Sequence, residues 1–98
     1  MGWPVIETLA WTREAQSDYD YWQRHNTGMR NRINQLVLNT TQNPLSGIGQ
    51  PRELFGSLSG IWSRKIDMTH RFVYAVNDTQ LTILSCRYHV KTSMVFSG

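Results

Sequence analysis

The chain has 98 residues, of which 40% are hydrophobic and 17% charged, and its formal net charge is +3. A chain of this size and composition folds as one small globular domain, without room for a separate regulatory domain. Its single cysteine excludes an intramolecular disulfide and a zinc site built from a cysteine cluster. No apolar run approaches the roughly 20 residues of a membrane helix, and no signal-peptide pattern opens the sequence, so we expect a cytoplasmic protein that has no membrane partner.

The net charge is distributed unevenly along the chain. Residues 1–51 are neutral in sum, so the whole excess falls in residues 52–98, which also hold His70 and His89. A basic half with titratable histidines favours an anionic partner such as a phosphate backbone. A solvated basic face that only aids solubility explains the charge equally well, and the charge alone does not separate these interpretations.

The first half of the chain predicts one strand and two helices. Residues 5–11 mix apolar and β-branched side chains, which is typical of a strand. Thr12 is a good N-cap for a helix that we expect to end near Asn26. A second helix is predicted from about Met29, where apolar residues recur on one face, to the Asn-Pro pair at 43–44.

The second half of the chain predicts a loop followed by strands. Residues 45–51 contain two glycines and a proline, which indicates the loop, and a glycine-rich turn is expected at 56–60. Asn77 and Asp78 predict a hairpin turn between the last two strands. The strands are predicted at residues 52–55, 61–68, 70–76 and 81–88. We expect residues 92–98 to form a tail that is disordered or depends on a partner.

This order of elements predicts the fold class. Helices come first and most strands cluster after them, which indicates an α+β fold. We therefore expect two N-terminal helices packed on one face of a mainly antiparallel sheet, with residues 1–98 forming a single domain.

The later strands place cations within apolar patterns. Because successive strand residues face opposite sides of a sheet, Arg64 shares a face with Trp62, whereas Lys65 shares the other face with Ser63. Histidine can deliver or take a proton near neutral pH, and arginine can hold a phosphate through two hydrogen bonds. If the exposed faces adjoin, they form one anion-binding surface from Lys65, Arg71, Arg87 and His89.

Such a surface suits the cleavage of RNA without a metal ion. Attack by the 2′-OH needs a base, cations that stabilise the phosphorane, and an acid for the leaving 5′-oxygen. No ligand spacing predicts a metal site and no glycine motif predicts a nucleotide site, so we expect no metal and no cofactor. The structural alternative stays open, in which Arg64 pairs with a carboxylate and Cys86 packs in the core.

Two segments carry a resemblance to a known family. Residues 58–76 read LSGIWSRKIDMTHRFVYAV and residues 85–89 read SCRYH, after GIGQP at 47–51. Through these motifs the chain resembles the YoeB/Txe toxins of the RelE superfamily, which belong to type II toxin–antitoxin modules. The resemblance implies a RelE-like fold, cleavage of mRNA at the ribosomal A site, a YefM-like antitoxin as partner, and a homodimer.

The resemblance also implies roles for individual residues. Arg71 matches the arginine that stabilises the cleaved phosphate, and His89 matches the histidine proposed as the general acid. Lys65 stands at the second basic position of the WSRR motif, where it keeps the charge and loses the bidentate geometry. The residues expected to contact RNA phosphates are Lys65, Arg64, Arg87, Arg52 and His70.

Two positions depart from the family pattern. Where the family has Lys-Pro-Glu-Pro-Leu, residues 50–54 read Gln-Pro-Arg-Glu-Leu, so Arg52 replaces the glutamate proposed as the general base. Glu53 follows as the candidate base, and it reaches the same face only if a bulge corrects the register, because a shift of one residue along a strand reverses the side chain. Val90 stands where the family often has a tyrosine.

These departures leave two alternatives to a ribosome-dependent nuclease. One is a binding module that keeps the toxin fold and its contacts with antitoxin or ribosome but cleaves weakly or not at all. The other is a nuclease that acts on free RNA or DNA without the ribosome.

Overall fold

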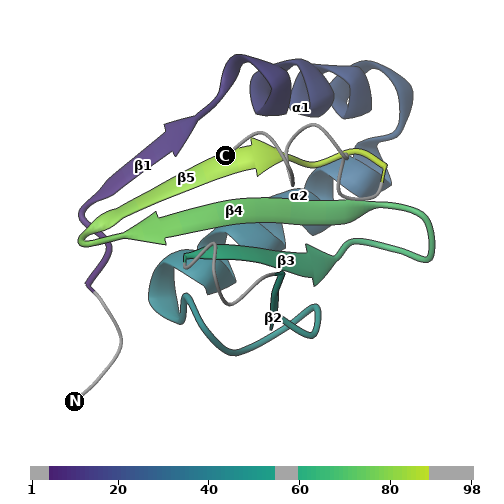
Figure 1. Ribbon diagram of the computed structural model, residues 1–98. Helices are drawn as coiled ribbons and strands as arrows, with labels where there is room; N and C mark the ends of the chain where they lie inside the picture. The colour runs from purple at the N-terminus through teal and green to yellow at the C-terminus, as the bar shows by residue number, and fades with distance from the viewer. Residues whose placement is uncertain (1–4, 55–59, 89–98) are drawn as a thin grey trace.

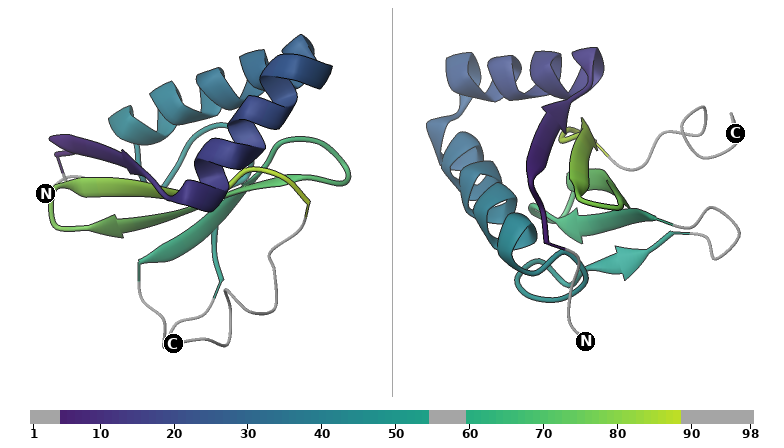
Figure 2. Two further views of the ribbon diagram at one scale, coloured as in Figure 1. Left: turned by 90° about the horizontal axis from the view of Figure 1, so that it is seen from above. Right: turned by 90° about the vertical axis from the view of Figure 1, so that its left-hand side faces the viewer.

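The computed structural model describes residues 5–54 and 60–88 and has two helices over one sheet (Figure 1). The strands are β1 (Thr8–Trp11), β2 (Arg52–Glu53), β3 (Ile61–Lys65), β4 (Arg71–Asn77) and β5 (Gln80–Ser85). The helices are α1 (Arg13–His25) and α2 (Thr27–Gln42), and both lie on the same face of the sheet (Figure 2). The predicted α+β fold with two N-terminal helices is confirmed.

The sheet has the order β1-β5-β4-β3-β2. Three of its four pairings are antiparallel, and the exception is β1, which runs parallel to β5. A parallel pair needs a long connection, and here α1 and α2 together with β2, β3 and β4 separate the two strands along the chain. The sheet is therefore mixed but mainly antiparallel, as predicted.

Each helix begins at a side-chain cap. Thr12 Oγ1 accepts a hydrogen bond from Ala15 N at 3.0 Å, and Asn26 Oδ1 accepts one from Met29 N at 3.2 Å. Asn26 thus follows the end of one helix and caps the next, so α2 begins two residues earlier than predicted. Among the described residues, neither helix has the length and hydropathy needed to cross a membrane.

The core lies between the helices and the sheet. Its fully or almost fully buried hydrophobic residues are Ala15, Trp22, Ile33, Leu36, Ile66, Phe72, Tyr74, Leu81, Ile83 and Cys86. Two hydrogen bonds join α1 to the residue after β5: Trp22 Nε1 donates to Cys86 O at 2.9 Å, and Cys86 N donates to Asp18 Oδ2 at 3.0 Å. The prediction that Cys86 packs in the core is confirmed.

The strands are shorter than predicted at several ends. The strand predicted at 61–68 ends at Lys65 because the chain turns before β4, and the strand predicted at 81–88 ends at Ser85. The hairpin between β4 and β5 is confirmed, although its turn is Asp78 and Thr79, since Asn77 still belongs to β4. The expected extension of β2 to residue 55, most of the glycine-rich turn and the tail at 92–98 lie outside the described residues.

Candidate functional site

Three cations gather on the face of the sheet formed by β2, β3 and β4. Lys65 and Arg71 are register partners across β3 and β4, and Arg52 is the register partner of Ser63 across β2 and β3. Together with Gln50 and Pro51, the cations line a hollow of about 410 Å³. We call this hollow the basic site; it is lined by Gln50, Pro51, Arg52, Lys65 and Arg71.

The arginine in the middle of the basic site is oriented by a neighbouring hydroxyl. Arg71 is half-buried, and its Nε donates to Ser63 Oγ at 3.1 Å. Burial lowers the pKa of Arg71, and the positive charge of Arg52 lowers it further. The guanidinium nevertheless stays charged at physiological pH, since an arginine pKa lies far above 7. The basic site therefore presents a fixed cation to an anionic ligand.

The loop before β2 places Arg52 at this site. Gly49 and Gln50 both have positive φ angles, 82° and 54°, and Lys65 N donates to Gly49 O at 2.6 Å. This backbone contact brings the end of the loop against β3. The next residues then enter β2, where Arg52 lies beside the other two cations.

Glu53 lies away from the basic site. Its register partner is Trp62, and it lines a different hollow with Trp62 and Val76. Arg52 and Glu53 are neighbours on a strand, so their side chains leave opposite faces of the sheet. In the part of the chain that the structure describes, no carboxylate lines the basic site.

The expectation that Arg64 contacts an RNA phosphate is wrong. Its side chain is 0% exposed, because it shares the helix-covered face of β3 with Trp62. The hydrogen bonds that the structure gives Arg64 go to neutral acceptors and not to the carboxylate that the alternative predicted. The guanidinium donates to the side chains of Tyr74 and Asn39 and to the backbone oxygens of Asn43, Ser46 and Ile48.

Arg87 does not line the basic site with Lys65 and Arg71. Its guanidinium carbon lies 3.5 Å from the centroid of the Tyr21 ring and 4.6 Å from that of Tyr88. These are the distances of cation–π contacts, which bind this cation to its own chain. Of the residues predicted to form one anion-binding surface, the structure describes three. Lys65 and Arg71 line the basic site, whereas Arg87 packs on aromatic rings elsewhere.

Of the two histidines of the predicted site, the structure describes His70. His70 comes directly before β4, and its Nδ1 accepts a hydrogen bond from Tyr88 N at 2.6 Å. Tyr88 O in turn accepts one from Arg71 N at 2.8 Å. His89 and Val90 lie outside the described residues, but the residue before His89 is joined to the backbone of Arg71.

Two neighbours of the cations are not among the predicted site residues. Ser63 orients Arg71, and Gln50 lines the basic site. The signal for Ser63 was present, because it lies two residues before Lys65 and therefore on the same face of β3. Gln50 belongs to the GIGQP segment at 47–51, but its approach to the basic site depends on the loop conformation. Among the described residues, no three His, Cys, Asp or Glu side chains gather where a metal ion could bind.

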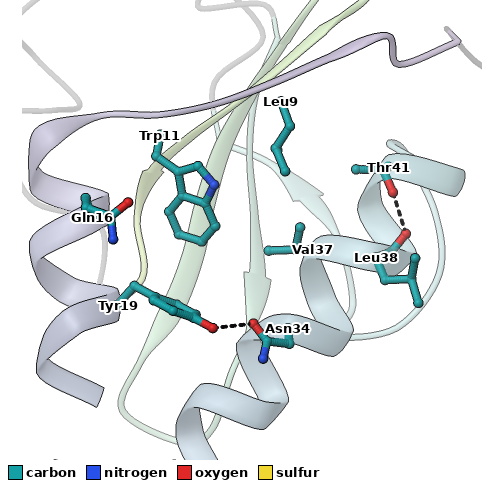
Figure 3. Close-up of a pocket in the computed structure, with 8 residues that line it drawn as sticks. All are labelled: Leu9, Trp11, Gln16, Tyr19, Asn34, Val37, Leu38 and Thr41. Atoms are coloured by element: carbon teal, nitrogen blue, oxygen red, sulfur yellow. Dashed lines mark hydrogen bonds between the residues drawn. The ribbon is translucent and has the colours of Figure 1, made fainter. Parts of the chain in front are cut away.

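A second, uncharged hollow lies where β1, α1 and α2 meet (Figure 3). It measures about 500 Å³ and is bordered by exposed Leu9 and Leu38, with 42% and 60% of their surface exposed. Across it, Tyr19 Oη donates to Asn34 Oδ1 at 2.7 Å, which joins the two helices. None of the residues that line it is a cation, so it does not share the electrostatic character of the basic site.

Comparison with known proteins gives consistent matches over most of the chain. Residues 11–90 match the family described as the YoeB-like toxin of bacterial type II toxin–antitoxin systems. The toxin YoeB of Escherichia coli is 46% identical over 81 residues, which cover 83% of this chain and 96% of that protein.

Solved structures give the same result. A YoeB/ParE toxin from Agrobacterium tumefaciens is 40% identical with a TM-score of 0.81, covering 86% of this chain and 100% of the other. YoeB from Staphylococcus aureus, solved as a dimer, is 37% identical with a TM-score of 0.78, covering 88% and 99%. A YoeB–YefM complex from the same organism matches with 38% identity and a TM-score of 0.75 over 87% and 98%.

Proposed function

Because the chain belongs to the YoeB-like toxins of bacterial type II toxin–antitoxin systems, we propose that it is an endoribonuclease that cleaves mRNA at the ribosomal A site. The observation that carries this proposal is the basic site, where Arg52, Lys65 and Arg71 lie around one hollow. Three cations in a partly enclosed hollow suit the phosphodiester backbone of RNA.

The proposed reaction is attack of the 2′-oxygen of RNA on the adjacent phosphorus. A base removes the 2′-OH proton, the new P–O2′ bond forms, and the bond to the 5′-oxygen breaks. An acid gives a proton to the leaving 5′-oxygen, so the products are a 2′,3′-cyclic phosphate and a 5′-OH end. We assign Arg71 to the charge of the phosphorane and Lys65 and Arg52 to contacts with phosphate oxygens.

His89 is the proposed general acid. The hydrogen bond from Arg71 N to Tyr88 O brings the residue before His89 to the strand that carries Arg71. His89 is the next residue along the chain. This short connection supports a common site for the proposed acid and the proposed phosphate contact.

Among the described residues that line the basic site, no carboxylate is present to act as the general base. Glu53 is the nearest carboxylate in the sequence, but it lines the hollow on the other face of the sheet. Loss of a general base costs roughly 10²- to 10⁴-fold in rate. We therefore propose a slow nuclease, in which charge stabilisation and positioning supply most of the remaining acceleration.

A second candidate function is a binding module with the toxin fold. The observation that favours it is Arg52 in the basic site at the position where the family pattern has a glutamate. Such a module would bind RNA or a partner protein without cleaving. A YefM-like antitoxin is the proposed partner in both cases, because S. aureus YoeB was solved with YefM, and a homodimer is proposed because the same toxin was solved as a dimer.

Primer extension on a defined mRNA, with and without programmed ribosomes, separates these functions. The ribosome-dependent nuclease predicts cuts that need the ribosome and that disappear in the Arg71→Ala and His89→Gln variants. A ribosome that is bound but not cut supports the binding module. Cuts in free RNA indicate a ribosome-independent nuclease, and equal cleavage of DNA, which lacks the 2′-OH, contradicts the proposed chemistry. Full growth inhibition by the Arg71→Ala/His89→Gln double variant would overturn the roles assigned to Arg71 and His89.

A further inference from the structure

The turn between β3 and β4 is held by a single carboxylate. Asp67 Oδ1 accepts hydrogen bonds from Thr69 N at 2.9 Å and from His70 N at 2.7 Å. Ile66 N donates to His70 O at 2.9 Å and closes the turn. A carboxylate that accepts from backbone groups a few residues ahead fixes the local backbone. The backbone of His70 is therefore held in place independently of the contacts that its side chain makes.

The His70 ring is held from α1. Its centroid lies 4.8 Å from that of Trp22, with the two planes at 79°. Trp22 is buried and donates to Cys86 O, so this surface is itself fixed. Because Nδ1 accepts from Tyr88 N, the ring proton is assigned to Nε2 and the imidazole in this arrangement is neutral.

Tyr88 adopts a conformation that needs such support. Its φ is 64°, in the left-handed region that is unfavourable for residues other than glycine. It lies beyond the last residue of β5, so the ladder between β4 and β5 does not hold it. Instead, its N–H donates to the His70 side chain and its carbonyl accepts from Arg71 N.

The two bonds place the end of the described chain at one end of the sheet. In Figure 1 the turn after β3 and the segment after β5 lie at the same end. His70 and Arg71 are consecutive in the chain. The side chain of His70 and the backbone amide of Arg71 therefore bind the N–H and the carbonyl of the same residue, Tyr88. That residue immediately precedes His89.

We propose that His70 is a positioning residue of the ribonuclease site, which holds Tyr88 against the backbone of Arg71. This inference rests on the proposed function. It adds a structural role to the expected phosphate contact of His70, because Nδ1 accepts from Tyr88 N and is not a donor to a phosphate. A misplacement of about 1 Å in a reacting group can cost 10²-fold in rate, so the loss of this hydrogen bond should lower kcat more than it changes KM.

Three variants of His70 separate the hydrogen bond from the packing. His70→Asn keeps an acceptor near the place of Nδ1 and removes the ring. His70→Gln carries the same amide one bond further out, so its acceptor is displaced. His70→Phe keeps an aromatic ring against Trp22 and removes the acceptor. If the Phe variant fails to fold, the comparison between Asn and Gln still tests the proposal.

The measurements are kcat and KM for cleavage on programmed ribosomes, the melting temperature, and hydrogen exchange at the Tyr88 amide. We expect His70→Phe and His70→Gln to lose protection at this amide and to lose about 10- to 100-fold in kcat. We expect His70→Asn to keep the protection and most of kcat. The Phe variant should melt close to the wild type, because the ring contact with Trp22 remains.

Two results would overturn the proposal in different ways. If the wild type cleaves and the Gln and Phe variants cleave equally well, the positioning role is wrong while the proposed function stands. The same conclusion follows if the Tyr88 amide stays protected in these variants. If the wild type does not cleave on the ribosome or in free RNA, the proposed function fails, and the ribonuclease role of His70 fails with it.

Discussion

Arg64 donates a hydrogen bond from Nη1 to the side-chain oxygen of Asn39 at 2.7 Å, deep between β3 and the end of α2. The same side chain also reaches the backbone oxygens of residues 43, 46 and 48. It thus ties the loop after α2 to β3, and this loop leads directly into Arg52. A buried cation on the helix-covered face therefore shapes the basic site on the opposite face.

This relationship predicts a large loss of stability in Arg64→Met. The substitution removes five hydrogen bonds, one buried and four part-buried, and a buried acceptor left without its donor costs about 1–3 kcal/mol. We expect the free energy of unfolding in urea to fall by roughly 2–4 kcal/mol. Lys65→Met is the matched control, because this half-buried neighbour faces the other side, and we expect a change within about 0.5 kcal/mol. Similar losses in both variants would contradict the role given to Arg64.

The cations show what the sequence could predict. Alternation along β3 correctly separated Lys65 from Arg64, and a turn-bounded apolar pattern predicted a strand at 70–76, one residue from the observed bounds of β4. The burial of Arg64 could not be predicted in the same way, since three of its acceptors are carbonyl oxygens whose directions depend on the loop conformation. The sequence placed Arg64 on the face of Trp62 and left both a phosphate and a carboxylate open as its partner.

Other features depend on pairing over long sequence distances. The parallel contact of β1 with β5 joins Leu9 to Leu81, and neither segment carries a pattern that names its partner. The hydrogen bond from Tyr88 N to His70 Nδ1 depends on a positive φ at a tyrosine, which local propensity disfavours. The sequence could therefore predict the class of fold and the grouping of Lys65 with Arg71. It could not predict the parallel pairing of β1 with β5 or the contact of Tyr88 with His70.

Gly49→Ala is predicted to destabilise the loop that enters the basic site. Gly49 has φ of 82°, and a Cβ there would lie 2.9 Å from Leu36 Cδ2 and 3.0 Å from Arg64 Cβ. The strained backbone and the close contacts together should cost about 1–3 kcal/mol in the free energy of unfolding. Urea denaturation monitored by tryptophan fluorescence measures this loss.

The control for this variant is Gly28→Ala in the first turn of α2. A Cβ at Gly28 would meet only Asn26 Oδ1 within 4 Å, at 3.3 Å. Alanine is favoured over glycine in a helix by up to about 1 kcal/mol, which offsets the small shift required of the Asn26 cap, so we expect a change within about 0.5 kcal/mol. If Gly49→Ala proved as stable as Gly28→Ala, the tight packing of the loop against β3 would be wrong.

Cys86 is predicted to resist alkylation in the folded protein. Burial raises the pKa of its thiol to about 12, and the nearby negative charge of Asp18 contributes to the increase. Relative to an ordinary thiol, the thiolate fraction at pH 8 should be lower by roughly 10³-fold. Iodoacetamide should therefore label the chain quickly in denaturant and very slowly in buffer. Equal labelling rates would contradict the buried thiol.

The same pKa shift has a consequence for stability at high pH. Because the folded-state pKa lies above the unfolded value, the folded state holds a proton that the unfolded state releases. The contribution is fully present below the unfolded pKa of about 8.5 and is lost as the pH rises toward 12, at about 1.4 kcal/mol per unit. Cys86→Ala should remove this part of the slope. A wild-type slope identical to that of the variant would contradict it.

Arg52→Glu is predicted to increase mRNA cleavage. The new carboxylate would stand on the face of β2 that carries Arg52 now, beside Lys65 and Arg71, where a base could take the 2′-OH proton. Since a general base contributes roughly 10²- to 10⁴-fold, we expect a gain of at least about 10-fold in the single-turnover rate on programmed ribosomes. Arg52→Gln is the matched control, because it removes the same cation without adding a base. A gain confined to Arg52→Glu supports a nuclease weakened by the arginine, and the Arg52→Glu/Glu53→Pro double variant then tests the full family pattern. Equal rates for Arg52→Glu, Arg52→Gln and the wild type would mean that another group already serves as the base.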